Sequence, residues 1–277
     1  LSQQRKVNFI QFELTENGEF DLDAYKRTLS ESPVKLVSVF HTSNILGTEL
    51  PIKEMVELAH ENGAYFLLDA AHAVTHAELN VKELDVDFMV FSGHKAFGPT
   101  GTGVLFGKYE LLKKLRPFVV GGETVDDVFY ENCSLMDVPH RFEAGLQNYS
   151  GILGLSKAID YIRKTGPEKI HKHVVKLNEQ LTEYIKTDEN IELLGPQEAN
   201  RRSSIVNFIH KKFKSEELCL LLDQSKQIMT RSGVHCGHAW YHKRNLMPSL
   251  RISFSAYNTQ EEVEDLIKTL KQFTKFY

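Results

Sequence analysis

The sequence predicts an α/β fold in which a mostly parallel sheet is covered by helices and followed by a smaller α+β region. In the first half, short apolar runs typical of buried strands alternate with helical segments. The expected strands are 36–40, 65–68, 88–91 and 104–106. A helix is expected over 51–62, because Pro51 suits a first turn and Gly63 follows as a stop signal.

The second half of the chain shows a different pattern from about Ser150 onward, with long amphipathic helices and separate strands. Helices are expected over 152–164, 170–186, 216–222 and 259–273, and strands over 191–194, 204–208 and 250–254. We therefore expect two domains, a large cofactor-binding domain over 1–155 and a C-terminal α+β domain over 156–277.

Composition excludes several classes of protein. The chain has 277 residues, 42% of them hydrophobic and 25% charged, which is ordinary for a globular protein with a core. A formal net charge of -4 favours neither a nucleic-acid partner nor an acidic membrane. No apolar run approaches the roughly 20 residues that cross a bilayer, and Leu1–Lys6 has no signal-peptide core. Three scattered cysteines argue against a disulfide framework and favour a cytoplasmic location.

Polar side chains follow three successive predicted strands. Ligands of parallel sheets bind outside the carboxyl ends of the strands, so this convergence predicts one shared site. The alternative is that polar residues simply begin loops. The residues concerned are Asn44, Asp69 with His72, and Ser92 with His94 and Lys95.

Lys95 and Asp69 favour pyridoxal 5'-phosphate among possible ligands. A lysine amine can form an imine with an aldehyde cofactor. Pyridoxal phosphate also needs a carboxylate beside its pyridinium nitrogen, and Asp69 ends the strand before the one that leads to Lys95. The structural alternatives are a solvated surface lysine and an aspartate that caps a helix.

Ser92 and His94 can bind the phosphate of such a cofactor. The glycine-rich segment 98–103 resembles a nucleotide-binding loop only superficially. It lacks the Gly-Lys-Ser/Thr ending and leads into a strand, so we reject a P-loop.

Cys236 is the candidate nucleophile. Arg231 and His235 precede it, and positive neighbours stabilise the reactive thiolate. Arg251 on a following strand can clamp a substrate carboxylate, with a surface salt bridge as the alternative role.

A zinc site competes for the same loop, because His235, Cys236, His238 and His242 are all potential ligands. Their spacing fits no two-plus-two pattern, and we predict no metal. Cys219 lies in an apolar run and is expected in the core.

Taken together, several stretches make the chain similar to cysteine desulfurases of the SufS-like branch, within the class V aminotransferases of pyridoxal-phosphate fold type I. The similarity runs from about Phe20 to the C-terminus. The matching stretches are 41–48, 69–72, 91–101, 141–145, 231–236 and 250–251.

The resemblance implies a role for each cofactor residue. Lys95 would hold the cofactor and later move protons, and Asp69 would pair with the pyridinium nitrogen. Ser92 and His94 would bind phosphate. The SufS-like branch usually has Gln against the ring oxygen, and this chain has His72 at that position. Related class V enzymes also use His there, so the resemblance implies that His72 contacts the ring oxygen.

For the substrate, the resemblance implies that Arg251 binds the carboxylate of L-cysteine and that Asn44 lies near that carboxylate and the ring oxygen. Cys236 would attack the substrate sulfur, keep a persulfide and release alanine. The family acts as a homodimer in which the segment 141–145 reaches the partner's cofactor, and a sulfur-acceptor protein is a further expected partner.

Two departures from the family pattern concern the phosphate site. Leu146-Gln147 replace the common Thr-Pro after Gly145, which removes a threonine contact to the neighbouring phosphate. The amino-terminal portion of the family, with its phosphate-cradling turn, has no counterpart in the sequence. The alternatives left open are a selenocysteine lyase or another class V enzyme, and a non-catalytic dimerisation or sulfur-relay module.

Overall fold

The computed structural model describes residues 7–276, so the leading segment 1–6, in which no signal-peptide core was found, lies outside the described residues. The chain forms two compact units. Unit 1 comprises the chain up to Pro33, Thr42–Pro51 and Lys169 onward, and unit 2 comprises Val34–His41 and Ile52–Glu168. This division by contacts differs in outline from the predicted domains 1–155 and 156–277, which stay a prediction.

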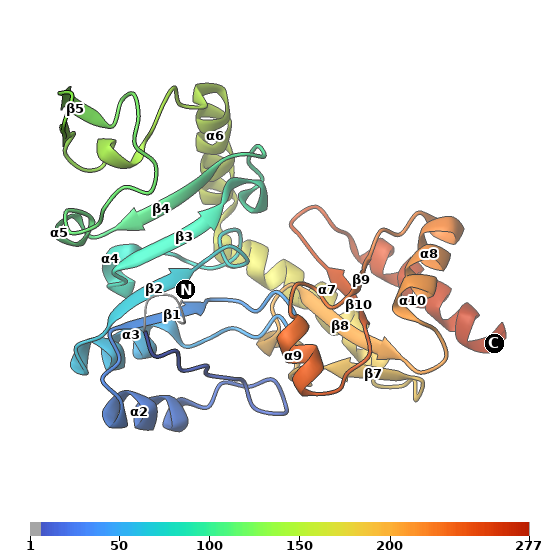
Figure 1. The fold of residues 1–277 in the computed structure, drawn as a ribbon. Helices are drawn as coiled ribbons and strands as arrows, with labels where there is room; N and C mark the ends of the chain where they lie inside the picture. The colour runs from blue at the N-terminus through green and yellow to red at the C-terminus, as the bar shows by residue number, and fades with distance from the viewer. Residues whose placement is uncertain (1–6, 277) are drawn as a thin grey trace. The chain divides into compact units, whose positions relative to one another are not determined.

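Unit 2 is built on a four-stranded sheet of order β1-β2-β3-β4 (Figure 1). Its strands are β1 (Leu36–Phe40), β2 (Tyr65–Asp69), β3 (Phe88–Ser92) and β4 (Gly103–Gly107). The first three are parallel, as predicted, and β4 is antiparallel to β3. The reversal follows from the short link between β3 and β4, which leaves no room for a crossover helix. Asp69 lies opposite Val90, so β2 and β3 end at the same edge.

Helices cover this sheet where the 3.6-residue pattern predicted them. Met55, Val56 and Ala59 of α3 (Ile52–Glu61) are buried. Leu155 and Ile162 of α6 (Tyr149–Thr165) form a core cluster with Val74 and Ala96. The remaining elements of unit 2 are α4 (Val81–Leu84), α5 (Tyr109–Leu112), the 3-10 helices η1 (Gly93–Ala96) and η2 (His140–Phe142), and the hairpin of β5 (Val125–Val128) and β6 (Cys133–Leu135).

Unit 1 contains an antiparallel sheet of order β7-β8-β10-β9 (Figure 1). Its strands are β7 (Ile191–Leu194), β8 (Ile205–His210), β10 (Ser249–Ser253) and β9 (Arg231–Gly233). The sequence predicted a loop at 231–233, because a three-residue segment without an apolar run gives no strand signal. Instead these residues pair with β10. The helical elements are α2 (Leu22–Glu31), α7 (Pro167–Ile185), η3 (Ala199–Arg201), α8 (Ser215–Lys226), α9 (His238–Lys243) and α10 (Gln260–Phe276).

The two faces of this sheet differ, since side chains alternate along a strand. Val206 and Phe208 of β8, with Leu250 and Ile252 of β10, join the core formed with α7, α8 and α10. The alternate positions Asn207, Ser249 and Arg251 therefore belong to the opposite face. In the described part of the chain, no helix is long and apolar enough to cross a membrane.

Candidate active site

Lys95 stands on a short 3-10 helix, η1, directly after β3. The Gly93 amide donates to the Thr102 carbonyl at 2.8 Å, and the Gly98 amide donates to the Gly93 carbonyl at 2.9 Å. A Cβ on Gly93 would lie 2.1 Å from Thr102 Oγ1, so only glycine fits this approach. Phe97, with φ 59°, ends the turn in the left-handed region. These contacts hold the lysine segment against the start of β4.

The first and last residues of η1 are buried, and the two between them are exposed. Gly93 and Ala96 are buried, whereas His94 and Lys95 are exposed. Ala96 packs into the cluster with Leu155 of α6. The small residues therefore anchor η1, and the two functional side chains remain accessible.

Asp69 ends β2 and is exposed. Its Oδ1 accepts a hydrogen bond from the Ala71 amide at 2.8 Å, and its carbonyl accepts one from the His41 amide at 2.8 Å. The carboxylate caps a turn, not a helix, because residues 71–76 form turns. His72 lies half-buried in that turn. Unit 2 thus gathers Asp69, His72, Ser92, His94 and Lys95 at or just beyond the ends of β2 and β3.

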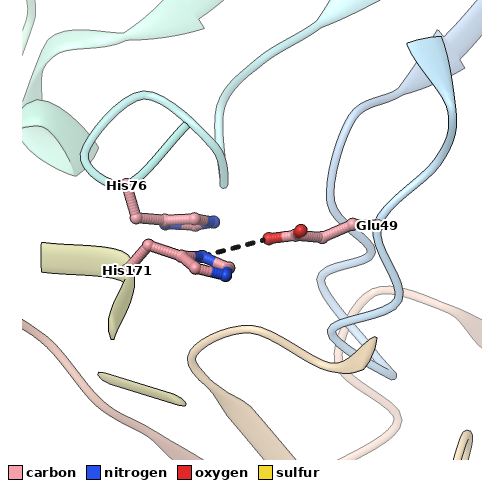
Figure 2. A group of neighbouring side chains, drawn as sticks. All are labelled: Glu49, His76 and His171. Atoms are coloured by element: carbon pink, nitrogen blue, oxygen red, sulfur yellow. Dashed lines mark ion pairs between the residues drawn. The ribbon is translucent and has the colours of Figure 1, made fainter. Parts of the chain in front are cut away.

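Asn44 belongs to unit 1, whereas the sequence grouped it with the strand ends of unit 2. Its Nδ2 donates to the His235 carbonyl at 2.7 Å, and its own carbonyl accepts from Arg251 Nη1 at 2.8 Å. Asn44 therefore links two predicted site residues of unit 1. Its loop is also tied to α7 by the ion pair of Glu49 Oε1 and His171 Nδ1, which are 3.7 Å apart (Figure 2).

Two arginines face each other across neighbouring strands. Arg251 of β10 lies opposite Arg231 of β9 and opposite Asn207 of β8. Burial lowers the pKa of Arg251, and the charge of Arg231 lowers it further. Like charges in such a cross-strand pair repel each other.

Arg251 has no carboxylate partner among the described residues. Its Nε is buried and makes no hydrogen bond there. A half-buried guanidinium without a counter-charge favours an anionic ligand, and a carboxylate fits its planar donor geometry.

Cys236 is exposed, and Arg231 Nη2 donates to its Sγ at 3.7 Å. The thiol lies in a turn closed by the Gly237 amide, which donates to the Val234 carbonyl at 2.7 Å. His235 and Cys236 have φ of 49° and 64°. Left-handed conformations at two non-glycine residues cost roughly 1–3 kcal/mol each. The surrounding contacts must offset this strain.

His235 is buried beside the exposed thiol, at 2% exposure. Burial lowers its pKa to about 4, with Arg251 and Arg231 contributing in the same direction. Its imidazole is therefore neutral at pH values near 7.

A zinc site in this loop would need at least three ligand atoms close to one another. Among the residues that the structure describes, the ligand atoms of this loop do not form a group of three within 4.8 Å. The rings of His238 and His242 have centroids 6.5 Å apart. Cys219, expected in the core, is partly buried and packs against the main core of unit 1.

Sequence reasoning missed Asn207, Tyr241 and Ser249. All three are buried, and they hydrogen-bond to one another next to His235. The one available signal was the alternation along β10, which places Ser249 on the same face as Arg251.

Comparisons with known proteins place this geometry in a family. The model for class-V aminotransferases matches residues 1–266. The chain belongs to the class V aminotransferases. A probable cysteine desulfurase of Vibrio cholerae is 34% identical over 270 residues, which cover 98% of this chain and 66% of that protein. Another, of Xylella fastidiosa, is 36% identical over 259 residues, 94% of this chain and 61% of that protein.

The fold agrees with this class V membership. The apo structure of a cysteine desulfurase from Thermococcus onnurineus NA1 superposes with a TM-score of 0.91 at 34% identity, covering 98% of this chain and 66% of that one. The α/β fold is therefore that of pyridoxal-phosphate fold type I, and the family depends on this cofactor. The chain spans between 61% and 66% of the length of these curated relatives.

Proposed function

We propose that this chain carries the catalytic groups of a pyridoxal-phosphate-dependent cysteine desulfurase, which converts L-cysteine to L-alanine and keeps the sulfur as a persulfide on Cys236. The observation that carries the proposal is the exposed thiol of Cys236 beside Arg231, in the turn that follows β9. On the neighbouring strand β10, Arg251 lacks an acidic partner among the described residues. Homology to cysteine desulfurases supports it.

The residues of unit 2 fit the cofactor chemically. An exposed amine (Lys95) and an exposed carboxylate (Asp69) follow neighbouring parallel strands. Lys95 would hold the cofactor, Asp69 would keep its ring nitrogen protonated, His72 would face the ring oxygen, and Ser92 and His94 would bind the phosphate. When bound, pyridoxal phosphate supplies an electron sink that weakens bonds of the attached substrate.

The residues of unit 1 fit the substrate. Arg251 would bind its carboxylate, and Asn44, which holds Arg251 through its carbonyl, would lie beside it. The Cys236 thiolate would attack the substrate sulfur, so that an S–S bond forms as the C–S bond breaks. The carbon that loses sulfur takes a proton, for which the Lys95 amine is a suitable donor. The products are alanine and the persulfide, and the proposal requires both units to act in one reaction.

The thiol step is tested by assaying alanine formation from L-cysteine with added pyridoxal phosphate. We expect Cys236→Ala to lose alanine formation roughly a hundredfold or more, since no nucleophile replaces the thiol. Cys133→Ala is the matched control, because Cys133 is also exposed, and it should retain activity. Alanine formation unchanged by Cys236→Ala would overturn the persulfide step and favour a selenocysteine lyase or another class V activity.

Cofactor binding is tested by the visible absorbance of the protein after incubation with pyridoxal phosphate. We expect absorbance that Lys95→Ala abolishes and that Lys82→Ala, another exposed lysine, leaves intact. A colourless wild-type protein would contradict the enzyme proposal and favour a dimerisation or sulfur-relay module. A homodimer and a sulfur-acceptor protein that takes the exposed persulfide complete the proposal.

A further inference from the structure

Three buried polar side chains of unit 1 form a closed ring of hydrogen bonds. Asn207 and Ser249 have no exposed surface, and Tyr241 is 2% exposed. Asn207 Nδ2 donates to the Tyr241 hydroxyl at 3.1 Å, and Ser249 Oγ donates to Asn207 Oδ1 at 2.6 Å. Tyr241 closes the ring with Ser249. Because the single serine proton goes to Asn207, Tyr241 must donate to Ser249.

The ring determines the tautomer of His235. Its Nε2 lies 3.0 Å from Ser249 Oγ. Since that oxygen has no further proton to give, His235 Nε2 must be the donor. Burial and the nearby arginines lower the pKa of His235 to about 4, so the ring carries one proton at neutral pH. Nδ1 is then unprotonated, and it is buried without a hydrogen-bond partner among the described residues.

His235 is also the first residue of the strained turn. It is held through its side chain by Ser249, and through its carbonyl by Asn44. The next residue, Cys236, is likewise left-handed. A Cβ on Gly237 would lie 2.1 Å from Ile45 Cδ1, so the exit from the turn is packed closely as well. Two left-handed residues persist only where surrounding contacts enforce them.

We propose that Ser249, together with Asn207 and Tyr241, is a positioning residue for Cys236: the ring keeps His235 as its Nε2–H tautomer and thereby holds the turn that presents the thiol to Arg231. The inference rests on the proposed role of Cys236 as nucleophile. Its test does not use the desulfurase reaction, so the positioning inference and the proposed function can fail separately.

Thiol reactivity is the first measurement. Wild type and Ser249→Ala are treated with iodoacetamide at about pH 7.5, and the alkylation rate of each cysteine is measured by mass spectrometry of its peptide. We expect the rate at Cys236 to fall roughly threefold or more in Ser249→Ala, because the thiolate loses its fixed place beside Arg231. Cys133 is exposed and serves as the internal reference, with an unchanged rate.

Matched variants separate positioning from a general loss of structure. Ser253→Ala removes an exposed hydroxyl from the same strand and should leave Cys236 unchanged. Ser249→Thr keeps the hydroxyl and should restore much of the rate. Tyr241→Phe breaks the ring at another member and should reproduce the effect of Ser249→Ala. If Ser249→Ala fails to fold, the alkylation rate of Cys236 in Tyr241→Phe tests the inference in its place.

The tautomer of His235 is the second measurement, by long-range proton–nitrogen correlation of the ring nitrogens, with His235→Gln to assign the signal. We expect the Nε2–H form in the wild type and its loss in Ser249→Ala, which removes the oxygen that accepts from Nε2. A wild-type Nδ1–H tautomer would overturn the inference. So would an unchanged alkylation ratio of Cys236 to Cys133 in a folded ring variant. If the ring variants show reduced reactivity of Cys236 but the wild type forms no alanine from L-cysteine, the proposed function is refuted and the positioning role of Ser249 stands.

Discussion

Asp87, the residue before β3, is a carboxylate that is only 4% exposed. It accepts hydrogen bonds from the Phe66 amide at 2.8 Å and from His60 Nε2 at 2.9 Å, and it lies 3.0 Å from Lys108 Nζ. Burial alone would raise its pKa, but the hydrogen bonds from His60, Phe66 and Lys108 outweigh burial and hold the pKa below 3.8. A single side chain thus joins α3, β2 and the end of β4.

We expect Asp87→Asn to lower the free energy of unfolding by about 3 kcal/mol, because it leaves Lys108 without its buried counter-charge. Asp85→Asn is the control. Asp85 pairs with the same lysine at 2.7 Å, but its side chain is 62% exposed, so its loss should cost about 1 kcal/mol or less. Urea unfolding at neutral pH measures both, and equal losses would contradict the burial argument.

The pH dependence of Asp87 has a definite sign. Its pKa is lower in the folded state than the ordinary 3.8, so the stability it contributes is present above that value and is lost as the pH falls through the folded pKa. The stability difference between wild type and Asp87→Asn should therefore narrow only in strong acid. A difference that disappears already near neutral pH would contradict this sign.

At the scale of elements, the 3-10 helix η1 depends on a glycine that lets it approach the start of β4. Gly93→Ala would bring a methyl group within 2.1 Å of Thr102 Oγ1. We expect a loss of about 1–3 kcal/mol in urea unfolding and weaker cofactor absorbance, because Lys95 lies on this element. Gly121→Ala is the control, since its Cβ would meet nothing within 4 Å. Equal stability and absorbance in the two variants would show that the close approach is not required.

At the scale of the whole molecule, unit 2 exposes large apolar side chains between β4 and α6. Phe118, Tyr130 and Leu146 are 102%, 105% and 89% exposed. Large apolar side chains exposed in this number are typical of proteins with an interaction surface. The homodimer of the proposed function would cover some of these side chains.

We expect sedimentation velocity to show concentration-dependent self-association, which the triple variant Phe118→Ser, Tyr130→Ser and Leu146→Ser weakens by removing apolar contact area. Met229→Ser is the control, because Met229 is 89% exposed in unit 1 and should not affect association. A wild-type protein that stays monomeric at all concentrations would contradict this prediction.

Local patterns in the sequence predicted most elements of the fold. The apolar runs at 36–40 and 88–91 are strands, and the helices near 152–164 and 170–186 are present with ends shifted by a few residues. The three-residue strand β9 was missed, since its pairing with β10 gives no local signal. Among the candidate site residues, Asp69 and Lys95 follow neighbouring strands as expected. Asn44 belongs to unit 1, where it hydrogen-bonds to His235 and Arg251, so its place beside Asp69 and Lys95 stays a prediction.

By itself the sequence determined the fold class, the class V resemblance and the side chains able to do chemistry, because these depend on residue type and short-range spacing. Only the tertiary structure decided which of them meet. Asn44 bonds to His235 across 191 positions, and Ser249 bonds to Asn207 across 42. Such contacts are set by strand register and by which face of a sheet is covered, and neither property is encoded in the local pattern around any one residue.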